Sequence, residues 1–296
     1  LPAEVIRLAS FANDTNPRRE ECFHGDISAQ LCSIGYEADK NEQVDFILWG
    51  DSHANAIFPG IDLAAQLDER SGLFVGKSGC PPVKNIDLVP SIGCQKFNES
   101  VLSWLRGRED IPVVILAARW TAYYEGTRFG GEPGGDIILS WVGTASDGND
   151  NFENSALIQT GLRQTITDLL DMGRSVVVLG PIPEVGRNVP ASLARQALSG
   201  GKAIAPVTRE EYDFRARDTE DFLMQVSIEE RPVKYVPLSH LFCDDNRCIM
   251  TGVDGTPLYV DDDHISRTTA RNILVPELRG IFSFGQKVHS YRGNPP

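Results

Sequence analysis

The chain contains 296 residues, of which 41% are hydrophobic, and its formal net charge is −13 at pH 7. This length fits one large α/β domain or two smaller ones, and the hydrophobic content is ample for a core. The negative charge argues against nonspecific binding to nucleic acid or to an anionic membrane. No apolar run approaches the ~20 residues that cross a bilayer. Because the chain begins with Leu1 and shows no signal peptide, we expect a processed or excised piece of a longer protein.

Residues 1–43 are polar, and we predict that they form an irregular N-terminal extension or linker containing a disulfide loop. Residues 44–296 show no internal repeat, no low-complexity segment and no second core. We therefore predict one folded domain over this range.

Six cysteines fall into three local pairs: Cys22 with Cys32, Cys80 with Cys94, and Cys243 with Cys248. Fifteen connectivities are possible in principle, and adjacent pairing is favoured because each pair closes a short loop. Two of the spacings are too wide for a metal knuckle, and the histidines are not arranged as a zinc site requires, so we expect no metal. Three disulfides would imply an oxidising compartment, whereas the alternative is six buried thiols in a cytosolic enzyme.

Five short apolar runs predict buried strands: Val44–Trp49, Leu73–Lys77, Pro112–Ala118, Ser175–Gly180 and Val233–Leu238. Amphipathic helical patterns separate these runs, and a last helix is predicted over residues 266–282. Strands that are apolar throughout and alternate with helices are typical of a parallel sheet covered on both faces. In such a sheet the ligand crevice lies beyond the carboxyl ends of the strands.

The first strand ends abruptly in Gly50-Asp51-Ser52-His53, and a helical pattern follows at once. A serine at this turn has an exposed hydroxyl close to a helix N-terminus, where free N–H groups favour developing negative charge. These are the needs of a nucleophile that forms an oxyanion. The alternative is that Ser52 only caps the helix, a role that we assign to Asp51. We expect His53 to be structural.

More than two hundred residues later, Asp261 and His264 stand three positions apart in Asp261-Asp262-Asp263-His264. One short turn can place both side chains on the same side, where the carboxylate would orient the imidazole that takes the serine proton. On spacing we prefer Asp261 to Asp262 or Asp263 in this role. A calcium site is a weaker alternative, because the acidic run lacks a glycine-turned loop.

These two motifs together resemble the SGNH hydrolase superfamily. The similarity is closer to one branch, the extracytoplasmic SGNH domain that is fused to membrane acyltransferase family 3 proteins. Shared features are Ser78-Gly-Cys-Pro-Pro82, Leu116-Ala-Ala-Arg-Trp120, Pro181-Ile-Pro183 and Asp263-His-Ile-Ser266, and the resemblance runs from about residue 44 to residue 283. It implies a flavodoxin-like three-layer α/β/α sandwich with a five-stranded parallel sheet, and a catalytic role for the domain at 44–296.

The sequence departs from the superfamily at its third motif, Gly-x-Asn-Asp, whose asparagine donates to the oxyanion. Here the third strand runs into Arg119-Trp120 without an asparagine. The second-motif glycine corresponds most naturally to Gly79, an oxyanion candidate whose alternative is a turn glycine. Arg119 either replaces the missing donor or contacts substrate, or else it pairs with a buried carboxylate. Trp120 either stacks on a sugar ring or packs in the core.

The resemblance implies O-acetylation of an extracytoplasmic bacterial polysaccharide or oligosaccharide, with Ser52 as nucleophile, His264 as general base and Asp261 as its orienter. The acyl donor would be delivered by a membrane acyltransferase domain that this chain lacks. The protein would then be periplasmic, tethered to the inner membrane in its full-length form. Two alternatives remain open: a carbohydrate O-acetyl esterase, and a glycan-binding module. Acyl transfer by such a triad needs no cofactor, and we expect no nucleic-acid partner.

Overall fold

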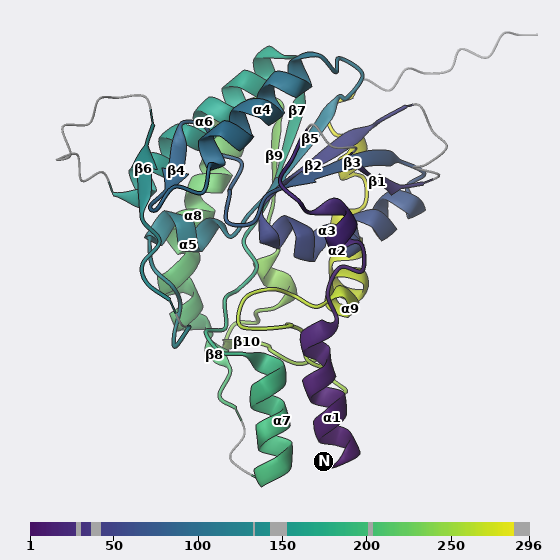
Figure 1. Ribbon diagram of the computed structural model, residues 1–296, viewed down its shortest axis with the longest axis vertical. Helices are drawn as coiled ribbons and strands as arrows, with labels where there is room; N and C mark the ends of the chain where they lie inside the picture. Colours follow the sequence, from purple (N-terminus) through teal and green to yellow (C-terminus); the bar gives the residue numbers. More distant parts are fainter. Residues whose placement is uncertain (28–30, 37–42, 133, 143–152, 201–203, 287–296) are drawn as a thin grey trace, which may run out of the picture.

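The computed structural model describes residues 1–27, 31–36, 43–132, 134–142, 153–200 and 204–286. Its centre is a six-stranded sheet with strand order β1-β3-β2-β5-β7-β9 (Figure 1). Five strands run parallel, and they are the five that the apolar runs predict: β2 (Phe46–Gly50), β3 (Ser71–Gly76), β5 (Val113–Ala117), β7 (Ser175–Leu179) and β9 (Val233–Val236). The predicted five-stranded parallel sheet is therefore confirmed.

The sixth strand, β1 (Cys32–Gly35), pairs antiparallel with β3 at the edge of the sheet. It lies in the segment predicted to be irregular, which also contains α1 (Ala3–Ser10), η1 (Phe11–Asn13) and α2 (Arg19–Cys22). The expectation of irregular structure over residues 1–43 is thus wrong for the described part. Only two of the four β1 residues are buried, and so short an alternation produces no clear periodic signal.

Side chains that alternate along the strands build two cores, one on each face of the sheet. In β2, Phe46 and Leu48 point into a core shared with α3 (Ser52–Leu67) and the C-terminal helical segments. The next residues along, Ile47 and Trp49, point into the core under α4 (Cys94–Arg106) and α6 (Asn154–Asp171). From α8 (Arg209–Glu229), Phe222, Leu223 and Val226 pack into this second core. The fold is therefore a three-layer α/β/α sandwich, as predicted (Figure 1).

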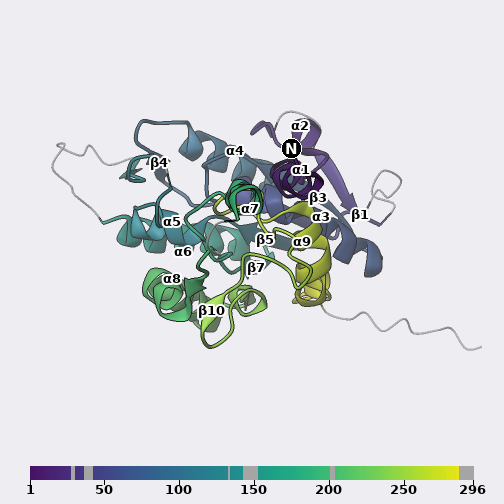
Figure 2. The same cartoon turned by 90° about the horizontal axis from the view of Figure 1, so that it is seen from below.

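The remaining elements lie around the sandwich. Two small antiparallel pairs join β4 (Ile86–Leu88) to β6 (Leu139–Trp141) and β8 (Val207–Thr208) to β10 (Arg247–Cys248). The short helices are α5 (Trp120–Glu125), η2 (Ser239–Leu241), α9 (Arg267–Thr269), η3 (Ala270–Leu274), α10 (Val275–Leu278) and η4 (Ile281–Ser283). The helix α7 (Val189–Ser199) lies beside α1, and the two project together from one end of the molecule (Figures 1 and 2).

The single helix predicted over residues 266–282 is instead a series of short helical segments. A π-helical turn, Ala270–Leu274, stands just before Pro276. Proline has no N–H to donate and its ring clashes with the carbonyl one turn back, so it disfavours an unbroken helix at this position.

All three predicted disulfides are present: Cys22–Cys32, Cys80–Cys94 and Cys243–Cys248. The first attaches α2 to β1, and the second attaches the loop after β3 to the start of α4. Within the part of the chain that the structure describes, no helix has both the length and the apolar character needed to cross a membrane.

Candidate active site

Ser52 is the first residue of α3 and follows directly after β2. The turn depends on Gly50, because a Cβ at this position would lie 1.8 Å from the carbonyl oxygen of Ala117 on the neighbouring strand. Asp51 caps the helix by accepting a hydrogen bond from the backbone N–H of His53 at 2.8 Å, as the sequence predicts. Strand, turn and cap together place the Ser52 hydroxyl at the carboxyl edge of the sheet.

The histidine 212 positions later lies against this serine. His264 Nε2 is 2.8 Å from Ser52 Oγ, and His264 Nδ1 is 2.9 Å from Asp261 Oδ2. Since a carboxylate only accepts, Nδ1 carries the proton, and in the neutral imidazole Nε2 is left to accept from the serine hydroxyl. The other Asp261 oxygen accepts the backbone N–H of His264 at 2.8 Å, which fixes the turn. The structure thus brings the three predicted residues together in the order that nucleophilic catalysis requires.

A second carboxylate also contacts the histidine. Asp263 Oδ1 lies 2.6 Å from His264 Nδ1, and its Oδ2 lies 3.6 Å from Nε2 of the buried His53. The sequence spacing favours Asp261 over Asp263, whereas the structure places both beside the same nitrogen. The run of three aspartates before His264 was the only sequence signal for this contact. Spacing alone does not show that the Asp263 side chain turns toward the imidazole.

These contacts shift the ionisation of the histidine. Burial lowers the pKa of His264, but the hydrogen bonds and charges of Asp261 and Asp263 outweigh it and raise the pKa to about 10. Burial would likewise raise the pKa of the Asp263 carboxyl, yet its contacts with His264 and His53 hold that pKa far below its usual range. The site therefore favours the protonated, imidazolium form of His264.

The guanidinium of Arg119 is occupied by buried carboxylates. Its Nε donates to Glu184 at 2.6 Å, its Nη1 lies 2.6 Å from Asp263, and it also pairs with Glu132. The predicted role of Arg119 as an oxyanion or substrate contact is therefore not what the structure shows. The guanidinium binds the Asp263 oxygen that does not contact His264 Nδ1. The alternative prediction, that Arg119 pairs with a buried carboxylate, is the correct one.

Trp120 is also unavailable to substrate. Its side chain is fully buried, and its Nε1 donates to the carbonyl oxygen of Leu179 at 2.9 Å. Of the two predicted roles, stacking on a sugar ring is wrong and packing in the core is correct. The reason is that α5 begins at this residue and turns the ring inward, a direction that sequence does not reveal.

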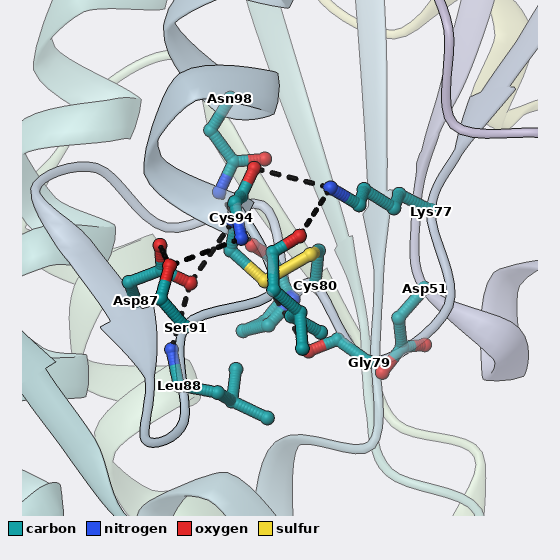
Figure 3. Close-up of a disulfide and its surroundings, with 12 residues drawn as sticks. Asp51, Lys77, Gly79, Cys80, Asp87, Leu88, Ser91, Cys94 and Asn98 are labelled. Atoms are coloured by element: carbon teal, nitrogen blue, oxygen red, sulfur yellow. Dashed lines mark hydrogen bonds between the residues drawn. A yellow bond between two sulfur atoms is a disulfide. The ribbon is translucent and has the colours of Figure 1, made fainter.

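Gly79 lies in a loop that the Cys80–Cys94 disulfide fastens to α4 (Figure 3). Its φ of +72° is a left-handed conformation that favours glycine. Lys77 donates to the carbonyl oxygens of Ile92 and Gly93, which also ties this loop to the start of α4 (Figure 3). The neighbouring Ser78, rather than Gly79, lines the cavity at the serine, so the assignment of Gly79 to the oxyanion hole stays a prediction.

A cavity of about 210 Å³ opens beside the Ser52–His264 pair. Its wall includes residues that the sequence analysis did not single out, among them Asn16, Asn55 and the exposed Arg19. Asn55 stands three positions after Ser52, which is about one helical turn, and this spacing is the signal that could have found it.

The described residues also contain groups of side chains close enough to share a metal ion, including His53 with Asp263 and His264, and Glu132 with Asp262 and Asp263. In both groups Asp263 is already paired with the guanidinium of Arg119, which supplies the positive charge that a cation would bring. The donor set therefore fits an internal ion-pair network better than a metal centre.

The family whose description is SGNH domain (fused to AT3 domains) matches residues 16–276. The chain belongs to this family. Its SGNH fold is also that of the periplasmic domain of a lipopolysaccharide acetyltransferase from Salmonella ser. Paratyphi A, which superposes with a TM-score of 0.60 at 12% identity over 92% of this chain and 94% of that one.

More distant structures are an acylhydrolase from Bacteroides fragilis, described as putative (TM-score 0.41, 10% identity, 81% of this chain and 86% of that one), and a GDSL-like lipase from Bacteroides thetaiotaomicron (TM-score 0.40, 10% identity, 90% and 96%). A comparison with curated protein sequences finds no match.

Proposed function

We propose that this SGNH domain is a serine-dependent O-acyltransferase that acetylates a hydroxyl of an extracytoplasmic bacterial polysaccharide. The observation that carries the proposal is the 2.8 Å contact between Ser52 Oγ and His264 Nε2, with Nδ1 held by carboxylates. Membership of a family fused to AT3 domains supports a membrane acyltransferase as the source of the acyl group. The similarity in fold to a lipopolysaccharide acetyltransferase periplasmic domain supports a periplasmic location and a glycan acceptor.

The reaction proceeds in two steps. Ser52 Oγ attacks the acyl carbonyl while its proton passes to His264 Nε2, and the donor departs with that proton to leave an ester on Ser52. An acceptor hydroxyl then gives its proton to Nε2 and attacks the ester, and Ser52 Oγ regains the proton as the acetylated glycan leaves. Asp261 keeps Nδ1 protonated and the ring in place throughout.

The nucleophile is tested with p-nitrophenyl acetate as an artificial donor. The native chain should release a burst of p-nitrophenol equal to one acyl group per molecule, and Ser52→Ala should release none above the uncatalysed rate. Ser100→Ala is the matched control, because Ser100 lies on α4 outside the cavity wall and its hydroxyl donates to the Lys96 carbonyl. Equal release by native and Ser52→Ala protein would refute the proposal.

The acceptor is tested by adding polysaccharide to the acylated protein. A transferase should release acetyl to glycan faster than to water, and mass spectrometry should find the acetylated sugar. Release to water alone, with no effect of glycan, would identify an esterase instead.

A further inference from the structure

The motif that normally supplies an oxyanion-binding asparagine is missing, and the residue at that place, Arg119, is engaged elsewhere. The backbone N–H of Ser52 is one available donor, because the first residue of a helix has no intrahelical acceptor. A tetrahedral oxyanion is usually held by more than one donor. A second donor in the cavity wall should be buried, fixed in orientation and without a protein partner.

Asn55 meets these conditions. It lies one helical turn after Ser52, so the two side chains share a face of α3, and both line the same cavity. The residue is only 5% exposed. Its Oδ1 accepts a hydrogen bond from Asn16 Nδ2 at 2.9 Å, while its Nδ2 has no acceptor among the residues that the structure describes. That nitrogen is not sealed from solvent, so it faces the cavity.

The orientation of the Asn55 amide follows from a backbone group. The N–H of Arg18, which can only donate, bonds to Asn16 Oδ1 at 3.0 Å. This contact identifies the oxygen of the Asn16 amide, so the other end of Asn16 is an NH₂ group that donates to Asn55. The atom of Asn55 that meets it must then be oxygen, and its NH₂ group is the end left for the cavity.

We infer that Asn55 is a catalytic residue whose Nδ2 donates to the oxyanion formed at Ser52, and that Asn16 is the positioning residue that fixes this amide. The inference rests on the proposed acyl transfer at Ser52. Asn55 takes over from within α3 the role of the missing asparagine. Asn16 is 3% exposed and comes from the N-terminal segment, which therefore contributes to the site.

The test measures the rate constant of the p-nitrophenyl acetate burst in Asn55→Ala, Asn55→Asp and Asn16→Asp. Loss of one oxyanion donor typically lowers kcat about 10²–10³-fold, and we expect a loss of this size in both Asn55 variants with KM little changed. The burst amplitude counts the molecules that react, so a fraction of misfolded protein lowers the amplitude and leaves the rate constant untouched. Asn55→Asp preserves the shape of the side chain and its bond from Asn16.

Asn16→Asp separates positioning from structural support. Asp at position 16 still accepts the Arg18 N–H, but it cannot donate to Asn55 Oδ1. The Asn55 amide should then turn over, bond through its NH₂ group and present its oxygen to the cavity. We expect the acylation rate to fall nearly as far as in Asn55→Ala, although the hydrogen-bonded pair is retained. Asn85→Asp is the control, since Asn85 forms a similar amide pair with Gln164 outside the cavity wall.

The outcomes are distinct for the two proposals. If Ser52→Ala is inert and the Asn55 variants acylate at the native rate, the oxyanion role is refuted while the proposed function stands. If Ser52→Ala reacts like the native chain, the proposed function itself fails. A rise in KM without a fall in kcat, or an equal loss in Asn85→Asp, would also overturn the role of Asn55. A native rate in Asn16→Asp would refute the positioning role.

Discussion

At the scale of single residues, His264 is unusual in having two carboxylates beside one ring nitrogen. Asp261 forms the oriented hydrogen bond, and Asp263 adds a charge that Arg119 and His53 hold in place from the far side. Each negative charge favours the protonated imidazole, so the resting histidine holds its proton to higher pH than an isolated one. In the proposed mechanism, the two carboxylates stabilise the imidazolium that forms when His264 takes the serine proton. They also raise the pH at which His264 becomes neutral and able to take it.

This arrangement predicts the pH dependence of acylation. Only neutral His264 can accept the serine proton, so the rate falls as pH drops below its pKa. Because that pKa is raised to about 10, kcat/KM for p-nitrophenyl acetate should still be rising above neutral pH. Asp263→Asn removes one charge and should shift the acidic limb to lower pH. Asp262→Asn, a change in the same acidic run, should shift it less. Superimposable native and Asp263→Asn profiles would contradict this account.

Sequence motifs were sufficient to predict that Ser52, His264 and Asp261 lie together, because their residue types and spacing are typical of such an arrangement. They were not sufficient for Arg119 and Trp120. Both follow a strand end, where a ligand site is expected, but whether such a side chain turns toward the crevice or the core depends on packing from distant elements. Asn16 could not have been found either, since its partner Asn55 is 39 positions away.

At the scale of elements, continuous apolar runs predicted all five parallel strands, because strands buried on both faces leave no polar residues to obscure the pattern. The edge strand β1 was not predicted, because it is too short to give a periodic pattern. The break in the C-terminal helix was not predicted either, because it depends on Pro276. The loop that contains Gly79 was placed correctly after its strand, and the Cys80–Cys94 disulfide explains how an irregular segment is fixed near Ser52.

Removal of that disulfide should therefore affect both stability and rate. A bond across a sequence separation of 14 closes a 15-residue loop, for which chain entropy predicts about 3 kcal/mol of stabilisation. The double variant Cys80→Ala/Cys94→Ala should lower Tm and also slow acylation, because Ser78 lines the cavity. Cys243→Ala/Cys248→Ala, which opens a shorter loop away from the cavity, should lower Tm less and leave the burst rate unchanged. Equal rates in the two double variants would refute the link between this loop and the site.

At the scale of the whole molecule, the described residues of the N-terminal segment pack against the SGNH fold. Strand β1 covers the edge of β3, and Asn16 donates a hydrogen bond to Asn55 in the cavity wall beside Ser52. Asp14 accepts the backbone N–H groups of Arg267, through its carbonyl at 2.6 Å, and of Thr268, through its carboxylate at 3.0 Å. These contacts join the N-terminal segment to the start of α9, so a boundary at residue 44, which polarity suggests, would cut through packed contacts.

Two truncations test this conclusion. A chain that begins at residue 44 loses β1, the Cys22–Cys32 disulfide and the hydrogen bonds of Asn16 and Asp14. We expect this chain to be insoluble, or to unfold at a much lower temperature and to give no p-nitrophenol burst. A chain lacking residues 1–10 loses only α1, whose buried Val5 and Leu8 form a small separate cluster with Ala194 of α7. This shorter deletion should fold and acylate at the native rate. A stable, fully active chain from residue 44 would instead establish the N-terminal segment as a linker, because neither the edge strand nor Asn16 would then be needed.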